Sequence, residues 1–312
     1  MAVYTRIQIS DVEKILAPYQ IEALDFTPIE GGNTNSNYHV RAKKGEYILT
    51  IAEEKSLEEV RDLASLLQCL GEHHFPTSRL LTSAGKEPVT IYSGQPILVK
   101  EWIPGSVHEN LSGNQLGQIG QTMAQLHQIP APDYLPKLHP YEQQAFSGIM
   151  DKSINPEYEN WLKERLQFFE QERPKNLPIG LIHGDVFFDN VLFEPNDIKA
   201  IIDFEEACDY YLIFDIAMGI LGLCRVDEKI DLKKANALVR GYEEVRPLTF
   251  LEKDSLVFFI EYAAVATSCW RFWKYNIHSP SPHLSDRYEE MVRVAKEAAK
   301  FSKAYFSSIV FK

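Results

Sequence analysis

Three polar residues in the second half of the chain have the types and the spacing that metal-assisted transfer of a phosphoryl group requires. Asp185 and Asn190 lie on one short segment, and Asp203 follows a run of apolar residues that is typical of a strand. An aspartate can accept the proton of an attacking hydroxyl, while an asparagine and a second aspartate can coordinate a metal ion that bridges phosphates. We therefore predict that Asp185 is the catalytic base and that Asn190 and Asp203 bind the metal.

The order of residues around this base supports the same chemistry. The segment His183-Gly184-Asp185-Val186-Phe187-Phe188-Asp189-Asn190 has the form H-x-D-x-x-x-x-N of a kinase catalytic loop. Each part is common by itself, but the joint requirement, with Asp203 at a strand end, argues against a chance match. His183 is expected to orient the loop through hydrogen bonds, because Asp185 already occupies the position of the base.

The interval between Asp203 and Asp215 is short, and no A-P-E sequence follows it. In protein kinases this part of the chain holds the activation segment, which ends at A-P-E. An interval of this length leaves no room for a segment that presents a peptide. The phosphoryl acceptor is therefore predicted to be a small molecule with a hydroxyl group.

A run of turn-forming residues near the start of the chain is a candidate for phosphate binding. Glycines let backbone amides approach a phosphate closely, and asparagine side chains can donate hydrogen bonds to it. The alternative is a simple Gly/Asn turn, but the position before a predicted hairpin and upstream of the catalytic loop favours phosphate binding. The residues concerned are Gly31, Gly32, Asn33, Asn35 and Asn37.

Two further features concern the nucleotide. The peptide groups of Glu101 and Ile103, at the expected junction of two lobes, are candidates for binding the adenine edge, whereas Trp102 between them is equally consistent with a core residue. Thr50 occupies the strand position where kinases usually carry a lysine that holds the phosphates. The missing charge would come from the bound metals or from a nearby lysine, the candidates being Lys43, Lys44 and Lys55.

The chain resembles the aminoglycoside phosphotransferase and choline kinase superfamily, whose members share the protein-kinase fold and phosphorylate small molecules. The resemblance is carried by residues 31–38, 181–190, 201–204 and 214–217, the last of which includes Asp215, a buried support of the catalytic loop in the family. Within the superfamily the chain looks most like bacterial homoserine kinases of this fold, on residues 47–50, 189–193, 241–248 and 271–272. The resemblance implies an enzyme that uses ATP and Mg²⁺ to phosphorylate L-homoserine, a step of threonine biosynthesis.

The acceptor site is open to more than one interpretation. Glu205 and its neighbour Glu206 could attract an ammonium group, and Arg271 and Lys274 could bind a carboxylate, which together would suit an amino acid. Solvated charges and a cation at a helix C-terminus are equally consistent with these residues. Homoserine kinases often carry aromatic residues in place of the two glutamates. Alternatives are therefore a kinase for an aminoglycoside, choline, hydroxylysine or a sugar, or a nucleotide-binding pseudokinase, which Thr50 favours.

The patterning predicts an α+β, two-lobed protein-kinase-like fold. Residues 1–102 are expected to form a nucleotide-binding lobe with a small antiparallel sheet and one packed helix, and residues 103–312 a mainly helical catalytic and acceptor-binding lobe with an embedded hairpin. Capping boxes predict helix starts at Ser10, Ser56 and Thr249. Further helices are expected over residues 116–129, 158–172, 232–242, 250–275 and 284–306.

The overall composition narrows the class of protein. The 312 residues are 45% hydrophobic, which is enough for a substantial core. The net charge of −12 argues against nucleic acid or an anionic membrane as the partner, because both need a basic surface. The first residues show no signal-peptide pattern and the most apolar runs are too short or carry charge to span a bilayer, so a cytoplasmic location is expected.

Overall fold

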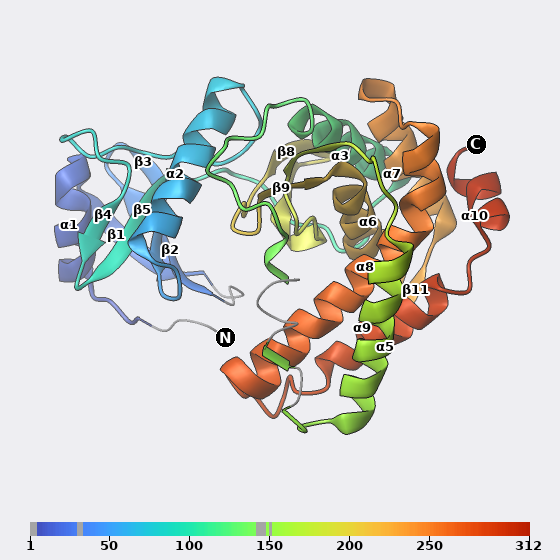
Figure 1. Cartoon of the computed structure of the whole chain (residues 1–312). Helices are drawn as coiled ribbons and strands as arrows, with labels where there is room; N and C mark the ends of the chain where they lie inside the picture. The colour runs from blue at the N-terminus through green and yellow to red at the C-terminus, as the bar shows by residue number, and fades with distance from the viewer. Residues whose placement is uncertain (1–4, 30–33, 142–147, 150–151) are drawn as a thin grey trace. The chain divides into compact units, whose positions relative to one another are not determined.

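The computed structural model describes residues 5–29, 34–141, 148–149 and 152–312, which form two compact units (Figure 1). The N-terminal unit comprises residues 1–105 with 199–202, and the C-terminal unit comprises residues 106–198 with 203–312. The first is built on an antiparallel sheet and the second is mainly helical, which confirms the predicted α+β class. The predicted division into functional lobes after residue 102 stays a prediction.

A five-stranded antiparallel sheet is the frame of the N-terminal unit. Its strands lie in the order β1-β2-β3-β5-β4, so β5 returns to pair with β3 in the middle of the sheet. The predicted hairpin near residue 40 is formed by β2 and β3, in which Asn37 is opposite Thr50. The strands are β1 (Ala23–Pro28), β2 (Asn35–Ala42), β3 (Gly45–Ala52), β4 (Thr90–Tyr92) and β5 (Gln95–Glu101).

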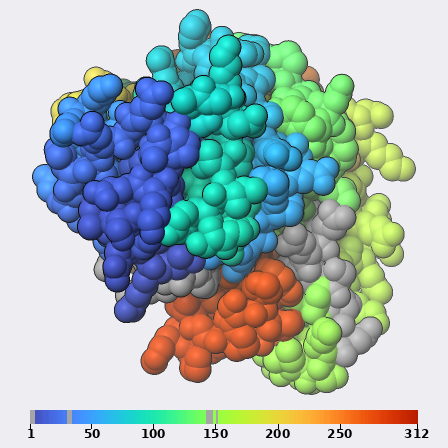
Figure 2. All heavy atoms as spheres, turned by 90° about the vertical axis from the view of Figure 1, so that its left-hand side faces the viewer, coloured from blue at the N-terminus to red at the C-terminus, as the bar shows by residue number. Residues whose placement is uncertain are grey.

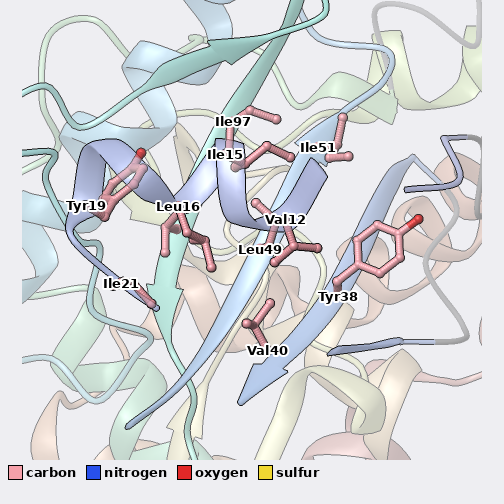
Figure 3. Packing of buried hydrophobic residues seen from close by; sticks show 11 residues of the cluster. Val12, Ile15, Leu16, Tyr19, Ile21, Tyr38, Val40, Leu49, Ile51 and Ile97 are labelled. Carbon is pink, nitrogen blue, oxygen red and sulfur yellow. The ribbon is translucent and has the colours of Figure 1, made fainter. Parts of the chain in front are cut away.

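Each face of this sheet is covered by a helix, because alternate strand residues point to opposite faces. Helix α1 (Ile9–Leu16) buries Val12, Ile15 and Leu16 against one face, where side chains of β2, β3 and β5 complete the core (Figure 3). Helix α2 (Leu57–Glu72) buries Val60 and Ala64 on the other face. The polar side of α1 faces solvent and contributes to the dark-blue surface in Figure 2. The unit thus carries two packed helices, where one was expected.

The predicted helix starts are confirmed at two of three positions. Ser56 caps α2 by accepting a hydrogen bond from the Glu59 amide at 3.3 Å, and Thr249 caps α8 (Phe250–Trp273) in the same way. The start predicted at Ser10 is wrong, since α1 begins at Ile9 and Gln8 forms the capping box. The Asp11 carboxylate accepts the Gln8 amide at 2.9 Å, so the Ser-x-x-Glu pattern marked a start that the helix does not use.

Short strands hold the segment with the H-x-D motif. Strand β6 (Ile179–Ile182) pairs with β9 (Cys208–Tyr211), and β7 (Val191–Glu194) pairs with β8 (Asp197–Ile201) as the expected embedded hairpin. The 3₁₀ turn η2 (Phe188–Asn190) leads directly into β7. A further small hairpin is formed by β10 (Arg225–Val226) and β11 (Lys229–Ile230).

Helices surround these strands in the C-terminal unit. Four of the predicted helices are present within a few residues of their expected bounds, and α8 continues into a π-helical turn, η3 (Lys274–His278). The single helix expected over residues 284–306 is wrong, because Ser302 breaks it by capping a second helix. The remaining helices are α3 (Gly113–Leu126), α5 (Pro156–Glu172), α6 (Leu212–Leu223), α7 (Leu232–Val245), α9 (Arg287–Ala298) and α10 (Lys303–Val310). None of the helices in the described ranges is long and apolar enough to cross a membrane.

Helices α3 and α7 lie side by side and approach each other closely (Figure 1). A Cβ added at Gly120 would lie 2.0 Å from the Leu238 carbonyl oxygen, and one added at Gly241 would lie 2.0 Å from the Gly117 carbonyl oxygen. Only glycine permits this backbone contact. The close packing brings the end of α3 next to the last turns of α7.

His139 joins the segment before α5 to the loop that follows β6. It is fully buried, its Nδ1 accepts the Tyr141 amide at 3.3 Å, and its Nε2 donates to the Gly184 carbonyl oxygen at 2.9 Å. This pairing requires the neutral ring with its proton on Nε2. Burial lowers the pKa of His139 to about 4, although the Gly184 carbonyl and the charge of Asp215 oppose the effect and His183 adds to it.

We predict that this histidine makes stability depend on pH. Unfolded imidazole titrates near 6.5 and the folded ring near 4, so between these values the unfolded state binds more protons and stability falls as the pH is lowered. From pH 7 to pH 5 the loss from His139 should be about 2 kcal/mol. Urea unfolding of His139→Gln should show a pH dependence smaller by that amount, while the exposed control His283→Gln should match the wild type. Equal pH dependence in all three proteins would contradict the prediction.

Candidate active site

The H-x-D segment is a tight loop between β6 and η2, and its shape requires a glycine. Gly184 has φ of +83°, and a Cβ at this position would lie 2.6 Å from the Glu206 carbonyl oxygen and 2.8 Å from His139 Nε2. Any other residue at this position would therefore have a strained backbone, and its Cβ would collide with these atoms. The close approach holds the segment that contains Asp185 against the segment that contains Glu206.

Asp215, in the first turn of α6, fixes the backbone of this loop. Its Oδ2 accepts the His183 amide at 3.1 Å and its Oδ1 accepts the Gly184 amide at 2.8 Å. Burial raises the pKa of Asp215, but the hydrogen bond and charge of His127 and the loop amide outweigh burial and keep the pKa below its usual value. The carboxylate is therefore ionised, and it serves as a rigid acceptor for two consecutive amides, as the resemblance implied.

A chain of buried donors supports Asp215 from behind. The guanidinium of Arg246 donates to the Tyr242 hydroxyl at 3.1 Å, that hydroxyl lies 2.7 Å from His127 Nδ1, and His127 Nε2 lies 3.0 Å from Asp215 Oδ2. Since Arg246 can only donate, the hydroxyl is able to donate onward and the imidazole to donate to the carboxylate. The contact of α3 with α7 thereby supports the H-x-D loop through His127 and Asp215.

Asp185 lies half-buried in this loop, with hydrogen bonds on both carboxylate oxygens. The Tyr141 hydroxyl donates to Oδ1 at 3.1 Å and the Asn190 amide approaches Oδ2 at 3.4 Å. The Asp185 amide donates to His183 Nδ1 at 3.2 Å, which agrees with an orienting role for that histidine. Burial and the charges of Glu206 and Asp203 raise the pKa of Asp185 well above its usual value. A strongly shifted carboxyl group of this kind is typical of a functional site.

Asn190 and Asp203 offer the oxygen ligands that Mg²⁺ prefers. The Asn190 side-chain nitrogen donates to the Asp185 carbonyl oxygen at 2.9 Å, which leaves its Oδ1 as the atom able to bind a metal. Asp203 is exposed and has φ of +68°, a conformation that costs free energy for a residue with a side chain and is often kept at functional sites. Negative charge gathers here from Asp185, Glu206 and Asp203, so a divalent cation fits the electrostatics.

No group of three or more His, Cys, Asp or Glu side chains suited to a metal occurs in the part of the chain that the structure describes. Two protein ligands alone are nevertheless usual for Mg²⁺ in phosphoryl transfer, because phosphates and water complete its coordination.

Tyr141, which contacts Asp185, and Trp270, which contacts Tyr141, had no counterpart in the predicted site. Tyr141 is 5% exposed, and its ring stacks on Trp270 of α8 with centroids 5.3 Å apart. Tyr141 lies far from the H-x-D motif in the sequence, and its spacing carries no pattern that predicts this contact. Trp270 directly precedes Arg271, a predicted acceptor residue. This position along α8 is the one sign in the sequence that Trp270 could lie near the site.

The candidates for nucleotide binding are only partly described. Gly31, Gly32 and Asn33 lie outside the described residues. Asn35 is buried, whereas Asn37 is half-buried and its Oδ1 accepts a hydrogen bond from Thr50 at 2.7 Å. Thr50, at the position of the usual lysine, is thus bonded to one of the predicted phosphate ligands.

The other nucleotide candidates are at the end of β5 and beyond it. Glu101 is exposed and its amide donates to the Arg79 carbonyl oxygen at 2.9 Å, so only its carbonyl group could meet an adenine edge. Ile103 is half-buried, and Trp102 stacks on His39 with centroids 4.1 Å apart. Of the candidate lysines, Lys43 forms an ion pair with Glu22.

The structure distinguishes among the predicted acceptor residues. The negative charge of Glu206 raises the pKa of Asp185, and Glu205 is its half-buried neighbour. Arg271 is bonded to Glu290 at 2.8 Å and donates to the Arg287 carbonyl oxygen at 3.2 Å. Lys274 is 2% exposed and lies one helical turn after Trp270.

Comparison with known sequences identifies the relatives of this chain. A model of the phosphotransferase enzyme family matches residues 25–248. The chain is 30% identical over 266 residues to a homoserine kinase of Caulobacter vibrioides, which covers 82% of this chain and 84% of that relative.

Solved structures of small-molecule kinases share the fold. A microcompartment-associated aminopropanol kinase superposes with a TM-score of 0.74 at 14% identity, over 98% of this chain and 99% of that chain. The amicoumacin kinase hAmiN, in complex with AMP-PNP, Ca²⁺ and Ami, gives a TM-score of 0.72 at 16% identity, over 96% and 97% of the two chains. These similarities confirm the predicted protein-kinase-like fold, and the sequence matches show that the chain belongs to the phosphotransferase enzyme family.

Proposed function

We propose that this phosphotransferase is an ATP- and Mg²⁺-dependent kinase that converts L-homoserine to O-phosphohomoserine. The observation that carries the proposal is the arrangement around Asp185: Tyr141 donates a hydrogen bond to its carboxylate, and the negative charge of the metal candidate Asp203 is near enough to raise its pKa. This is the geometry that a base needs in order to orient a hydroxyl for attack on a phosphate.

In the proposed reaction the acceptor oxygen attacks the γ-phosphorus of ATP in line with the bond to the leaving oxygen. That bond breaks as the new P–O bond forms, ADP departs, and the hydroxyl proton passes to Asp185. The fixed loop supplies orientation, because Asp215 holds the backbone amides of the two residues that precede the base. Asn190 and Asp203 would hold Mg²⁺, which neutralises phosphate charge when it is bound.

The Thr50–Asn37 pair is our candidate for the role that a lysine usually shares. Thr50 donates its hydroxyl to Asn37 Oδ1, which directs the two N–H groups of the Asn37 amide away from Thr50 and makes them available as donors. A neutral amide contributes less than a lysine to charge neutralisation, so the metal should carry more of the phosphate charge.

Homoserine is favoured over other acceptors by the curated relatives, several of which are homoserine kinases at 28–30% identity. In this chain the ammonium group would meet Glu206, close to Asp185. Lys274 is our candidate for the carboxylate, because it shares a helix face with Trp270. An aminoglycoside, choline, hydroxylysine, sugar or amino-alcohol kinase is the alternative within the family.

A pseudokinase is the alternative of another class, favoured by Thr50 at the lysine position. The presence of Asp185, Asn190 and Asp203 together argues against it, because a scaffold has no need for a base and two metal ligands.

An acceptor panel tests the substrate. We predict that kcat/KM for L-homoserine exceeds that for choline, an aminoglycoside, hydroxylysine and a simple sugar by about 100-fold, because a site built for two charged groups rejects acceptors that leave those groups unpaired. A coupled ADP assay with Mg²⁺ and ATP measures each rate. A preference for another acceptor would replace homoserine, and absence of turnover with all of them would favour the pseudokinase.

Replacement of the base separates chemistry from binding. We predict that Asp185→Asn lowers kcat by about 10²- to 10⁴-fold, since the amide cannot accept the proton, while ATP affinity changes little. Steady-state kinetics and calorimetric titration of ATP provide the two measurements. Turnover at the wild-type rate would exclude Asp185 as the base.

A metal-ligand substitution has a matched control elsewhere in the chain. Asp203→Asn should raise the Mg²⁺ concentration needed for half-maximal turnover by about tenfold, because an amide oxygen binds the cation more weakly than a carboxylate. The control is Asp227→Asn, because Asp227 is also exposed and also has a left-handed backbone, with φ of +55°. It measures the effect of the same substitution in the same backbone conformation away from the proposed metal site. If Asp227→Asn shifts the Mg²⁺ dependence equally, Asp203 is not a ligand.

A further inference from the structure

Tyr141 is the one side chain from outside the H-x-D motif with a direct hydrogen bond to Asp185 among the described contacts. Its hydroxyl donates to Asp185 Oδ1 at 3.1 Å. Burial and the nearby charge of Asp185 raise the pKa of Tyr141 well above its usual value, so the hydroxyl keeps the proton that it donates. The contact therefore places a permanent donor on one oxygen of the carboxylate.

We propose that Tyr141 is a positioning residue for phosphoryl transfer: it fixes the Asp185 carboxylate through Oδ1 and so leaves Oδ2 as the oxygen that receives the acceptor proton. The inference rests on the proposed role of Asp185 as the base. Carboxylate torsions are broad and nearly two-fold, so the side chain has little intrinsic preference for one orientation. A donor on a single oxygen supplies that preference.

Two residues, Trp270 and His139, hold the tyrosine in place. Its ring stacks on Trp270, and the ring of His139 meets it at 88° with centroids 4.7 Å apart. Its backbone amide donates to His139 Nδ1, and the same histidine donates from Nε2 to the Gly184 carbonyl oxygen, next to Asp185. Tyr141 is thus linked to the H-x-D loop directly, through its hydroxyl and Asp185, and indirectly, through His139 and Gly184.

The two carboxylate oxygens differ in what they bind. The Tyr141 hydroxyl lies 3.1 Å from Oδ1, whereas the Asn190 amide nitrogen lies farther from Oδ2, at 3.4 Å. Asn190 donates more closely to the Asp185 carbonyl oxygen, at 2.9 Å. Oδ2 is therefore the oxygen with lone-pair capacity to accept a proton from a substrate hydroxyl.

Removal of the Tyr141 hydroxyl tests this role. Tyr141→Phe keeps the stacked ring, so it should lower kcat by about 10- to 100-fold while the KM values for ATP and the acceptor stay within about twofold. Tyr158 provides a matched control: it is also 5% exposed, and its hydroxyl lies 2.7 Å from Ser268 Oγ. Tyr158→Phe should reduce the melting temperature as much as Tyr141→Phe and leave kcat unchanged.

A double-mutant cycle tests whether Trp270 acts through Tyr141. Trp270→Leu removes the stacking partner and should lower kcat by itself, but it should lower kcat much less in the Tyr141→Phe background, because the hydroxyl that the stacking orients is already absent. Independent, multiplicative effects would overturn the linkage.

The outcomes separate this inference from the proposed function. Wild-type turnover with any acceptor, together with unchanged kcat in Tyr141→Phe, overturns the positioning role and leaves the kinase assignment intact. A reduced kcat in Tyr158→Phe equal to that in Tyr141→Phe also overturns it, since the effect would then be a general loss of stability. Absence of wild-type turnover with every acceptor overturns both.

Discussion

The active-site loop depends on the Asp215 carboxylate, which accepts the amides of His183 and Gly184 in the interior of the C-terminal unit. Without it, two buried donors would have no partner, and each such loss costs about 1–3 kcal/mol. The left-handed turn at Gly184 and the positions of Asp185 and Asn190 follow from this anchor. Helices α3 and α7 also support this carboxylate, because their close packing at glycines brings His127 within hydrogen-bond distance of Asp215.

Negative charge is concentrated around Asp185, which bears on how an acidic chain can be a phosphotransferase. Asp185, Glu206 and Asp203 repel one another, as the raised pKa of Asp185 reflects after the larger effect of burial. In the absence of a cation this arrangement is a cost that the hydrogen bond from Tyr141 partly offsets. With Mg²⁺ on Asn190 and Asp203, the same charges would favour cation binding and place positive charge against the phosphates.

The sequence could predict the parts of the site that lie close together along the chain. The H-x-D motif, the strands around it and Asp203 form one continuous stretch, so local spacing carried the information. Tyr141 and His139 reach Asp185 through tertiary contacts that no local pattern encodes. Two predictions of helix bounds were wrong for a different reason. At Ser10 and over residues 284–306 the helical pattern was present, but the helices have their N-caps at Gln8 and Ser302.

The geometry of α8 shows how a helix can separate two cations that are close in sequence. Arg271 follows Trp270 directly, and successive helix residues point about 100° apart, so its guanidinium turns to Glu290, which Arg225 also binds. Lys274 follows Trp270 by four residues and therefore shares its face, next to the ring on which Tyr141 stacks. Arg271 thus stabilises the contact of α8 with α9 through Glu290 and the Arg287 carbonyl oxygen.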